Sequence, residues 1–268
     1  MTRQGALTKV PAVTLGFWII KILATTLGET GGDTVTMTWL GETTGAATGY
    51  GYLIGTGLIF VPFVVLVIAQ IVAKKFHPLL YWATIIGSTM LGTTLADFAD
   101  RSLGIGYPGG SVLLFVLVLA SLAAWYWSEG TVSVQTVSTP RVEVFYWLTI
   151  TFSQTLGTAL GDWTADSLDA WRDGAGYVGG AVLFGAALAV VAIFYFRTRV
   201  SHVVLFWAAF ILTRPLGATV GDFFDKPISK GGLDISRPLA TAALAAAILA
   251  LIFILPQRAG NHPGESAA

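Results

Sequence analysis

Four aspartates are the residues of this chain best placed to do chemistry, because each follows a Leu-Gly pair near the end of a long apolar stretch. They are Asp33, Asp97, Asp162 and Asp222, separated by 64, 65 and 60 residues. A carboxylate is costly in hydrocarbon and normally faces the protein interior, where it binds an ion, relays a proton or pairs with a base. Four matched carboxylates therefore predict one shared task.

Polar residues accompany each aspartate at intervals of four, the spacing that places side chains on one face of a helix. The four stripes are Lys21, Thr25, Glu29 and Asp33; Thr89, Thr93, Asp97 and Arg101; Gln154, Thr158, Asp162 and Asp166; and Arg214, Ala218, Asp222 and Lys226. Carboxylate and hydroxyl oxygens suit manganese, calcium or magnesium better than soft metals. We expect the metal ligands to be Asp33, Asp97, Asp162, Asp222 and Glu29, with Thr25, Thr93, Thr158 and Gln154 as supporting polar side chains.

Two basic residues, Lys21 and Arg214, lie within these apolar stretches. Because buried charges are normally paired, we expect Lys21 to neutralise Glu29 or a neighbouring aspartate, and Arg214 to neutralise Asp162 or Asp222. Two alternatives remain open. Lys21 could couple ion movement to proton movement, or both bases could hold an anionic substrate.

The aspartates belong to a longer repeat, which fixes the elements that must position them. A tryptophan stands 15 residues before each aspartate, an aromatic residue immediately before that tryptophan, and a glycine five residues before the aspartate. We expect the tryptophans in the cytoplasmic interfacial belt of a membrane. Small residues one and five positions before each aspartate favour close helix packing. The motif therefore predicts an aspartate that faces protein near the outer end of a helix.

The composition indicates a membrane protein, since 54% of the residues are hydrophobic and only 11% are charged, against about 25% charged in soluble domains. We expect an all-α polytopic protein of four parallel two-helix repeats, arranged around a pseudo-fourfold axis or with nested pseudo-twofold symmetry. The repeats are expected at 10–73, 78–128, 143–197 and 202–256 of a single domain, 1–256. The eight spans are expected at 10–31, 51–73, 78–97, 109–128, 143–162, 177–197, 202–222 and 237–256.

Lysines and arginines of the loops favour a cytoplasmic location for both termini. The expected localisation is the bacterial cytoplasmic (inner) membrane, with residues 257–268 as a disordered cytoplasmic tail. The first apolar stretch is interpreted as a retained helix rather than a signal peptide.

Several function classes have no support in the sequence. The net charge is zero and cysteine is absent, which argues against nucleic acid binding and excludes thiolate metal sites and disulfides. We find no nucleophile–base pair and no histidine cluster within the apolar stretches, so neither an enzyme nor a cofactor is expected. The expected partners are the lipid bilayer, a small inorganic cation and protons, with a homo-oligomer left open.

The four Trp-to-Asp frames resemble a family of bacterial membrane-anchored proteins of unknown function, built from four tandem two-helix repeats. The resemblance covers residues 10–256 and implies the architecture rather than an activity. Residues 29–34, Glu-Thr-Gly-Gly-Asp-Thr, are also distantly similar to the Glu-x-Gly-Asp-basic-Thr signature of calcium/manganese–proton exchangers. This motif has an extra residue between the acids and lacks the basic position.

The leading hypothesis is a secondary transporter for a hard divalent cation, with coupling to protons left open. One alternative is a membrane sensor or scaffold in which the polar stripes only hold the helices together. Another is a transporter of a small organic solute that uses the tryptophans and the paired charges.

Overall fold

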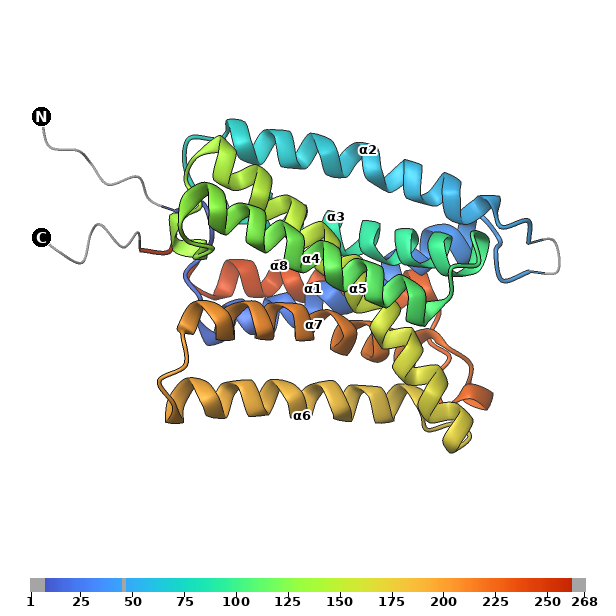
Figure 1. The fold of residues 1–268 in the computed structure, drawn as a ribbon. Coiled ribbons are helices and arrows are strands. Elements are labelled where there is room, and N and C mark those ends of the chain that lie inside the picture. Colours follow the sequence, from blue (N-terminus) through green and yellow to red (C-terminus); the bar gives the residue numbers. More distant parts are fainter. Residues whose placement is uncertain (1–7, 45–46, 262–268) are drawn as a thin grey trace, which may run out of the picture.

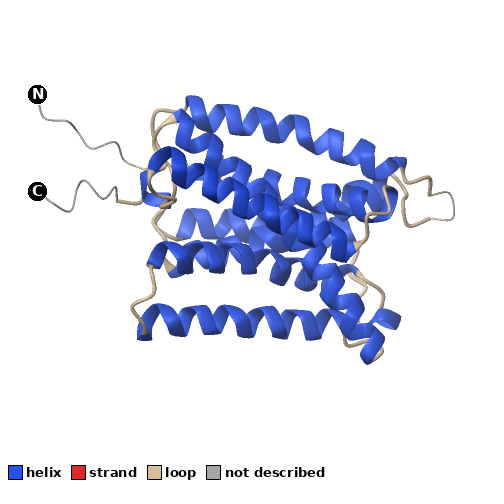
Figure 2. Ribbon diagram, viewed as in Figure 1, coloured by secondary structure: helices blue, strands red, loops and turns tan. Residues whose placement is uncertain are grey.

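The computed structural model describes residues 8–44 and 47–261, and this part of the chain folds into eight α-helices without an extended strand (Figures 1 and 2). In chain order the helices are α1 (Leu15–Asp33), α2 (Tyr50–Val72), α3 (Pro78–Asp97), α4 (Tyr107–Glu129), α5 (Pro140–Trp171), α6 (Gly176–Arg197), α7 (His202–Asp225) and α8 (Arg237–Ile254). The eight expected spans correspond to these helices one by one. The main differences are that α1 begins five residues later and α5 ends nine residues later than expected.

Helix starts and stops follow from local chemistry. Prolines lie in the first turn of α3, α4, α5 and α8, where the missing N–H removes no helical hydrogen bond. The hydroxyl of Thr14 accepts a hydrogen bond from the backbone N–H of Phe17 at the start of α1. Gly130 ends α4 in a left-handed conformation, as is common for glycine just beyond a helix.

The odd-numbered helices form a closed inner ring, in which α1 packs on α3, α3 on α5, α5 on α7, and α7 on α1. Each even-numbered helix packs on the outside of this ring, against the first helix of the following repeat: α2 on α3, α4 on α5, α6 on α7, and α8 on α1 (Figure 1). The aspartates of all four repeats therefore come to the same end of the ring, which we call the aspartate end.

Six of the helices in the described residues are long and apolar enough to cross a membrane: α2, α3 (with its extension to Ser102), α4, α6, α7 and α8. Large apolar side chains are exposed along the outer helices, such as Phe60 on α2, Phe115 on α4 and Phe253 on α8. In water these surfaces would be unfavourable, but they match hydrocarbon. The fold is therefore all-helical with four repeats, and its exposed apolar helices are compatible with a membrane protein.

The opposite end of the ring is closed by aromatic side chains, and we call it the aromatic end. The aromatic residue before each tryptophan contacts the tryptophan of the next repeat, with ring centroids 5.5 to 6.3 Å apart. The four pairs are Phe17 with Trp82, Tyr81 with Trp147, Tyr146 with Trp207, and Phe206 with Trp18. The hydroxyls of Tyr81 and Tyr146 also share a hydrogen bond of 2.7 Å.

The expected position of the tryptophans is therefore corrected. Trp82, Trp147 and Trp207 are buried in the main hydrophobic core, not on a lipid-facing surface. The interfacial-belt interpretation failed because these rings pack between helices of neighbouring repeats, which sequence spacing along one helix does not reveal.

The segments near the two termini lie together at the aromatic end. Pro11 and Ala259 form an isolated antiparallel bridge, and the indole N–H of Trp82 donates to the side-chain carbonyl of Gln257. Residues 257–261 are thus hydrogen-bonded to the helical domain, in contrast to the disordered tail expected from residue 257. The rest of that expected tail, residues 262–268, lies outside the described residues.

Candidate functional site

A column of buried side chains, most of them polar, runs along the axis of the inner ring. Its members lie at the aspartates and at positions four, eight and twelve residues before them, and all are buried. From the aspartate end inward, the four levels are Asp33, Asp97, Asp162 and Asp222; Glu29, Thr93, Thr158 and Ala218; Thr25, Thr89, Gln154 and Arg214; and Lys21, Ile85, Ile150 and Phe210. The column therefore changes from acidic at the aspartate end to basic farther in.

Glycines make this close approach of the helices possible. In each repeat, the glycine five residues before the aspartate packs against a residue of the next repeat. That residue stands eight positions before its own aspartate. The four contacts are Gly28 on Thr89, Gly92 on Gln154, Gly157 on Arg214, and Gly217 on Thr25. A Cβ at Gly92 would lie 2.8 Å from the backbone carbon of Gln154, so no larger residue fits there without displacing α5. The repeated glycine thus sets the width of the column.

Two basic residues bridge the four aspartates in pairs. Arg101 lies four residues after Asp97, and its Nε is 2.6 Å from Oδ1 of that residue, while its Nη2 is 3.8 Å from Oδ2 of Asp162. Lys226 lies four residues after Asp222. Its Nζ is 2.7 Å from Oδ1 of Asp222 and 2.5 Å from Oδ2 of Asp33. Each bridge therefore joins a repeat's own aspartate to that of the next repeat.

The Lys226 bridge includes further charges. Its Nζ is also 3.3 Å from Oδ1 of Asp225, and Nε of Arg237 lies 3.6 Å from Asp225 and 3.8 Å from Asp33. Burial lowers the pKa of Lys226, but the carboxylates of Asp222, Asp33 and Asp225 outweigh burial and hold this pKa well above its ordinary value. The ammonium therefore stays charged at the centre of three carboxylates.

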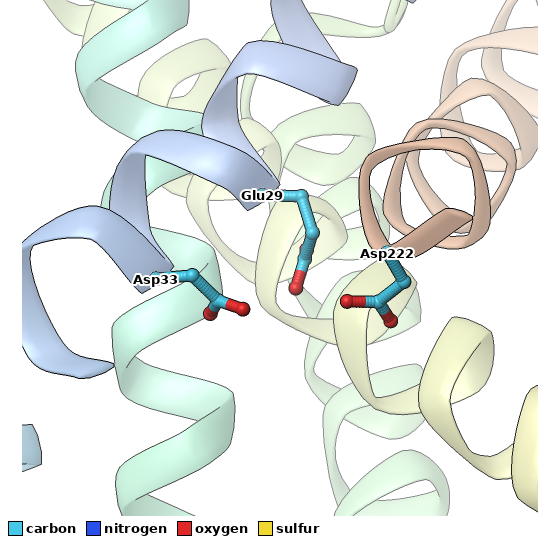
Figure 3. A group of neighbouring side chains, drawn as sticks. All are labelled: Glu29, Asp33 and Asp222. Carbon is cyan, nitrogen blue, oxygen red and sulfur yellow. The ribbon is translucent and has the colours of Figure 1, made fainter. Parts of the chain in front are cut away.

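Beside Lys226, three buried carboxylates converge between α1 and α7. One oxygen from each of Glu29, Asp33 and Asp222 lies within 4.8 Å of the others, and Figure 3 shows the side chains pointing toward one another. Oδ1 of Asp33 is buried without a hydrogen-bond partner. These three side chains supply oxygen ligands of the type that a hard cation prefers, and we call them the carboxylate group.

The carboxylate group contains three of the five expected metal ligands. Asp97 and Asp162 lie in the same level of the column but are paired with Arg101 on another side of the ring. Thr93 lies beside the group, where its hydroxyl is 3.4 Å from Oε2 of Glu29 and 3.0 Å from the carbonyl oxygen of Gly28. Thr25, Thr158 and Gln154 lie on the column but are not members of the group.

The expected partners of Arg214 and Lys21 are wrong. Nη2 of Arg214 pairs with Oε2 of Glu29 at 3.0 Å, rather than with Asp162 or Asp222, and it donates to the hydroxyls of Thr93 and Thr158. The side chain reaches from its own level to the next one toward the aspartate end, where Glu29 is the only acid. Within the described part of the chain Lys21 has no carboxylate partner, and its Nζ lies 4.1 Å from the ring centroid of Phe210.

Sequence reasoning did not assign roles to Arg101, Lys226 and Arg237, and it placed Asp225 in a solvated outer mouth that concentrates cations, whereas this residue is buried beside Lys226. The first two could have been found, because they continue the four-residue stripes one turn beyond the aspartates. Asp225 is off that stripe, and Arg237 begins α8 in a distant part of the chain. Its approach to Asp33 depends on the packing of α8 against α1.

The fold is all-helical with four internal repeats around a buried charge column, and its apolar helices are compatible with a membrane protein. Matches to the family described as Repeat of Unknown Function (DUF347) cover residues 16–76, 80–131, 145–201 and 205–258, and the chain belongs to this family. The four matched segments correspond to the four two-helix repeats. No curated protein and no solved structure matches the chain, so the suggested likeness to calcium/manganese–proton exchangers has no support from relatives.

Proposed function

We propose that the protein is a secondary transporter for a hard divalent cation such as manganese, calcium or magnesium. The observation that carries this proposal is the convergence of Glu29, Asp33 and Asp222, three buried carboxylates with one oxygen each within 4.8 Å of the others. Thr93 would add a neutral oxygen beside Glu29. Oxygen-only sites of this kind favour hard cations over copper or zinc.

In this proposal Lys226 holds the place of the substrate. Its ammonium lies against Asp33 and Asp222, the two aspartates of the carboxylate group, so a cation that binds there must displace it. Lysine suits this role because its charge is a compact group on a flexible stem. Lys226 directly follows the end of α7, so its side chain can swing outward at the aspartate end of the ring.

The balance of charges favours a divalent cation. With every acid ionised, Glu29, Asp33, Asp222 and Asp225 carry four negative charges, and Arg214, Lys226 and Arg237 carry three positive charges. Replacing Lys226 by a divalent cation makes the cluster neutral, whereas a monovalent cation leaves it negative. Protons are the proposed coupling ion, because crowded carboxylates exchange protons readily when a cation arrives or leaves; Glu29 is the proposed carrier.

The proposed membrane arrangement has eight spans around a pseudo-fourfold axis along the membrane normal, in the bacterial inner membrane. Support comes from the closed ring of odd helices and from the equivalent levels of side chains along it. The positive charges of the loops favour cytoplasmic termini, which places the carboxylate group toward the outer side. The aromatic end would then close the path to the cytoplasm in this conformation.

The test is uptake of Mn²⁺ into proteoliposomes, followed with an internal dye that Mn²⁺ quenches. Asp33→Asn and Asp222→Asn should each reduce the initial rate at least about tenfold, since each removes a charged ligand that is worth at least about 1.4 kcal/mol of binding. Asp97→Asn is the matched control, because it changes an equivalent aspartate outside the carboxylate group and should retain most of the rate.

All variants should first be shown to be folded by gel filtration in detergent. The proposal fails if the wild-type protein moves none of Mn²⁺, Ca²⁺ and Mg²⁺. It also fails if Asp33→Asn and Asp222→Asn transport as fast as the wild-type protein.

A second candidate is a sensor or scaffold without transport. It is favoured by the basic partners of the four motif aspartates, since Arg101 and Lys226 together reach all of them. If these ion pairs only stabilise the ring, Asp33→Asn and Asp97→Asn should lower the yield of folded protein equally, and no solute should move.

A further inference from the structure

The inner part of the column, toward the aromatic end, contains a buried amine that has no carboxylate partner among the described residues. Lys21 is fully buried, and its Nζ has no hydrogen-bond partner. Its contact with the face of Phe210 directs the amine toward α7, where Arg214 lies one turn farther along. A buried ammonium without an acid is strongly unfavourable, so this position needs an explanation.

Further unpaired donors lie at the next level of the column. Nε and Nη1 of Arg214 and both amide atoms of Gln154 are buried and have no hydrogen-bond partner. The hydroxyls of Thr25 and Thr89 at the same level already donate to backbone carbonyls. Lys21, Gln154 and Arg214 therefore carry unpaired N–H groups on two adjacent levels of the column, and we call these three side chains the inner donor cluster.

The hydrogen-bonding groups and charge of this cluster indicate which kind of ligand would satisfy it. Lysine and arginine side chains have donors only, so the single unpaired acceptor in the cluster is Oε1 of Gln154. The carboxylate of Glu29 neutralises the charge of Arg214. An ammonium at Lys21 would therefore have no compensating charge. Water could satisfy the donors but not the charge, and loss of a proton from Lys21 would leave the donors of Arg214 and Gln154 unpaired.

We propose that the inner donor cluster binds one small monovalent anion, of which chloride is the simplest example. One anion would accept from Lys21, Arg214 and Gln154 and would make the inner column neutral. A small ion is required because the helices approach closely here, with Gly157 packed on the side chain of Arg214 and Gly28 on Thr89. This site touches the carboxylate group only through Arg214, whose Nη2 pairs with Glu29, and it does not rest on cation transport.

The experiment measures the thermal unfolding of the detergent-purified protein at constant ionic strength, with chloride replacing gluconate as the anion. A ligand that binds only the folded state raises the unfolding temperature. We expect a saturable rise of several degrees with chloride for the wild-type protein. We expect no rise for Lys21→Met, which removes the charge, or for Gln154→Leu, which removes the amide at nearly the same size.

Lys74→Met is the matched control, because it removes an exposed lysine outside the column and should keep the full chloride effect. A bromide soak of crystals provides a readout that does not depend on folding of a variant, and it should give anomalous density beside Nζ of Lys21. The proposal is overturned if chloride and gluconate give equal unfolding temperatures, or if Lys21→Met retains the shift. Absence of bromide at Lys21 would overturn it as well. Transport of Mn²⁺ is not measured in these experiments, so failure of the anion site and failure of the cation transporter are distinguishable.

Discussion

Arg101 and Lys226 occupy equivalent positions in the second and fourth repeats, and their surroundings differ. The Arg101 side chain is 41% exposed and bridges Asp97 and Asp162. The Lys226 side chain is 14% exposed and contacts Asp33, Asp222 and Asp225. The same duplicated frame has thus produced one bridge at the surface and one in the interior.

The chemistry of the two bases sharpens this contrast. Arginine is always charged and holds carboxylates with a planar, multiply donating group, whereas lysine presents a single mobile point charge. Only the lysine bridge adjoins a third acid of the column, Glu29, to form the carboxylate group. We interpret Arg101 as a clasp, meaning a base that only holds two helices together, and Lys226 as a replaceable cation, meaning a base that the substrate can displace.

The largest expected effect comes from removing each base. Lys226→Met leaves three buried carboxylates without their ammonium and should destabilise the protein by about 3 kcal/mol, and Mn²⁺ should restore much of this loss by taking its place. Arg101→Met also leaves two buried carboxylates, Asp97 and Asp162, without their base, but Arg101 is itself partly exposed and water can screen its loss, so the cost should be smaller, about 1–2 kcal/mol, with no recovery on adding Mn²⁺. The measurement is thermal unfolding in detergent with and without Mn²⁺. Equal recovery of both variants, or of neither, would contradict the division into a clasp and a replaceable cation.

Exchanging the two bases should have the next largest effect. Lys226→Arg keeps the charge but supplies a group that grips two carboxylates at once, so Mn²⁺ uptake should fall about tenfold, equivalent to about 1.4 kcal/mol. Arg101→Lys should change uptake less than about twofold, which is under about 0.4 kcal/mol. Initial rates in proteoliposomes provide the comparison. If Arg101→Lys slows uptake as much as Lys226→Arg does, the two bridges are functionally alike and the contrast is wrong.

Much of the fold was predictable from the sequence, because a bilayer fixes the length of apolar helices and duplication repeats their markers. The expected span 78–97, which contains the motif from Trp82 to Asp97, coincides with α3 as observed. The family match confirms the four repeats. Spacing along one helix also predicted which residues line the column, as the buried Thr25, Gln154 and Arg214 illustrate.

The pairing of charges was not predictable, because it depends on which helices are neighbours and how far each side chain reaches between levels. Arg214 pairs with Glu29 on the next helix of the ring and one level closer to the aspartate end, a relation that periodicity within one repeat cannot give. Arg237 approaches Asp33 only because the last helix packs on the first. Lys21 shows the limit of the rule that buried charges are paired, since the column offers it no acid at its own level.

The smallest expected effect is on Mn²⁺ binding when one of two equivalent glycines is replaced by alanine. The comparison separates the effect of helix packing from the effect of displacing a ligand. A Cβ at Gly161 would lie 2.8 Å from Cβ of Ala218, and a Cβ at Gly221 would lie 2.7 Å from Cβ of Glu29. Both Gly→Ala substitutions should therefore destabilise the protein by about 1–2 kcal/mol through overpacking. Only Gly221→Ala displaces a member of the carboxylate group, so it alone should weaken Mn²⁺ binding, by about threefold or 0.6 kcal/mol.

Titration of Mn²⁺ against the unfolding temperature of each variant would measure both effects at once. Gly57→Ala on the outer helix α2 is the control, because a Cβ there meets no atom within 4 Å and should leave stability and Mn²⁺ binding nearly unchanged. Equal loss of Mn²⁺ affinity in Gly161→Ala and Gly221→Ala would mean that binding responds to the packing of the whole ring. The cation would then not be held by the carboxylate group at the Lys226 bridge alone, and the aspartates of the Arg101 and Lys226 bridges would have to be treated as one site.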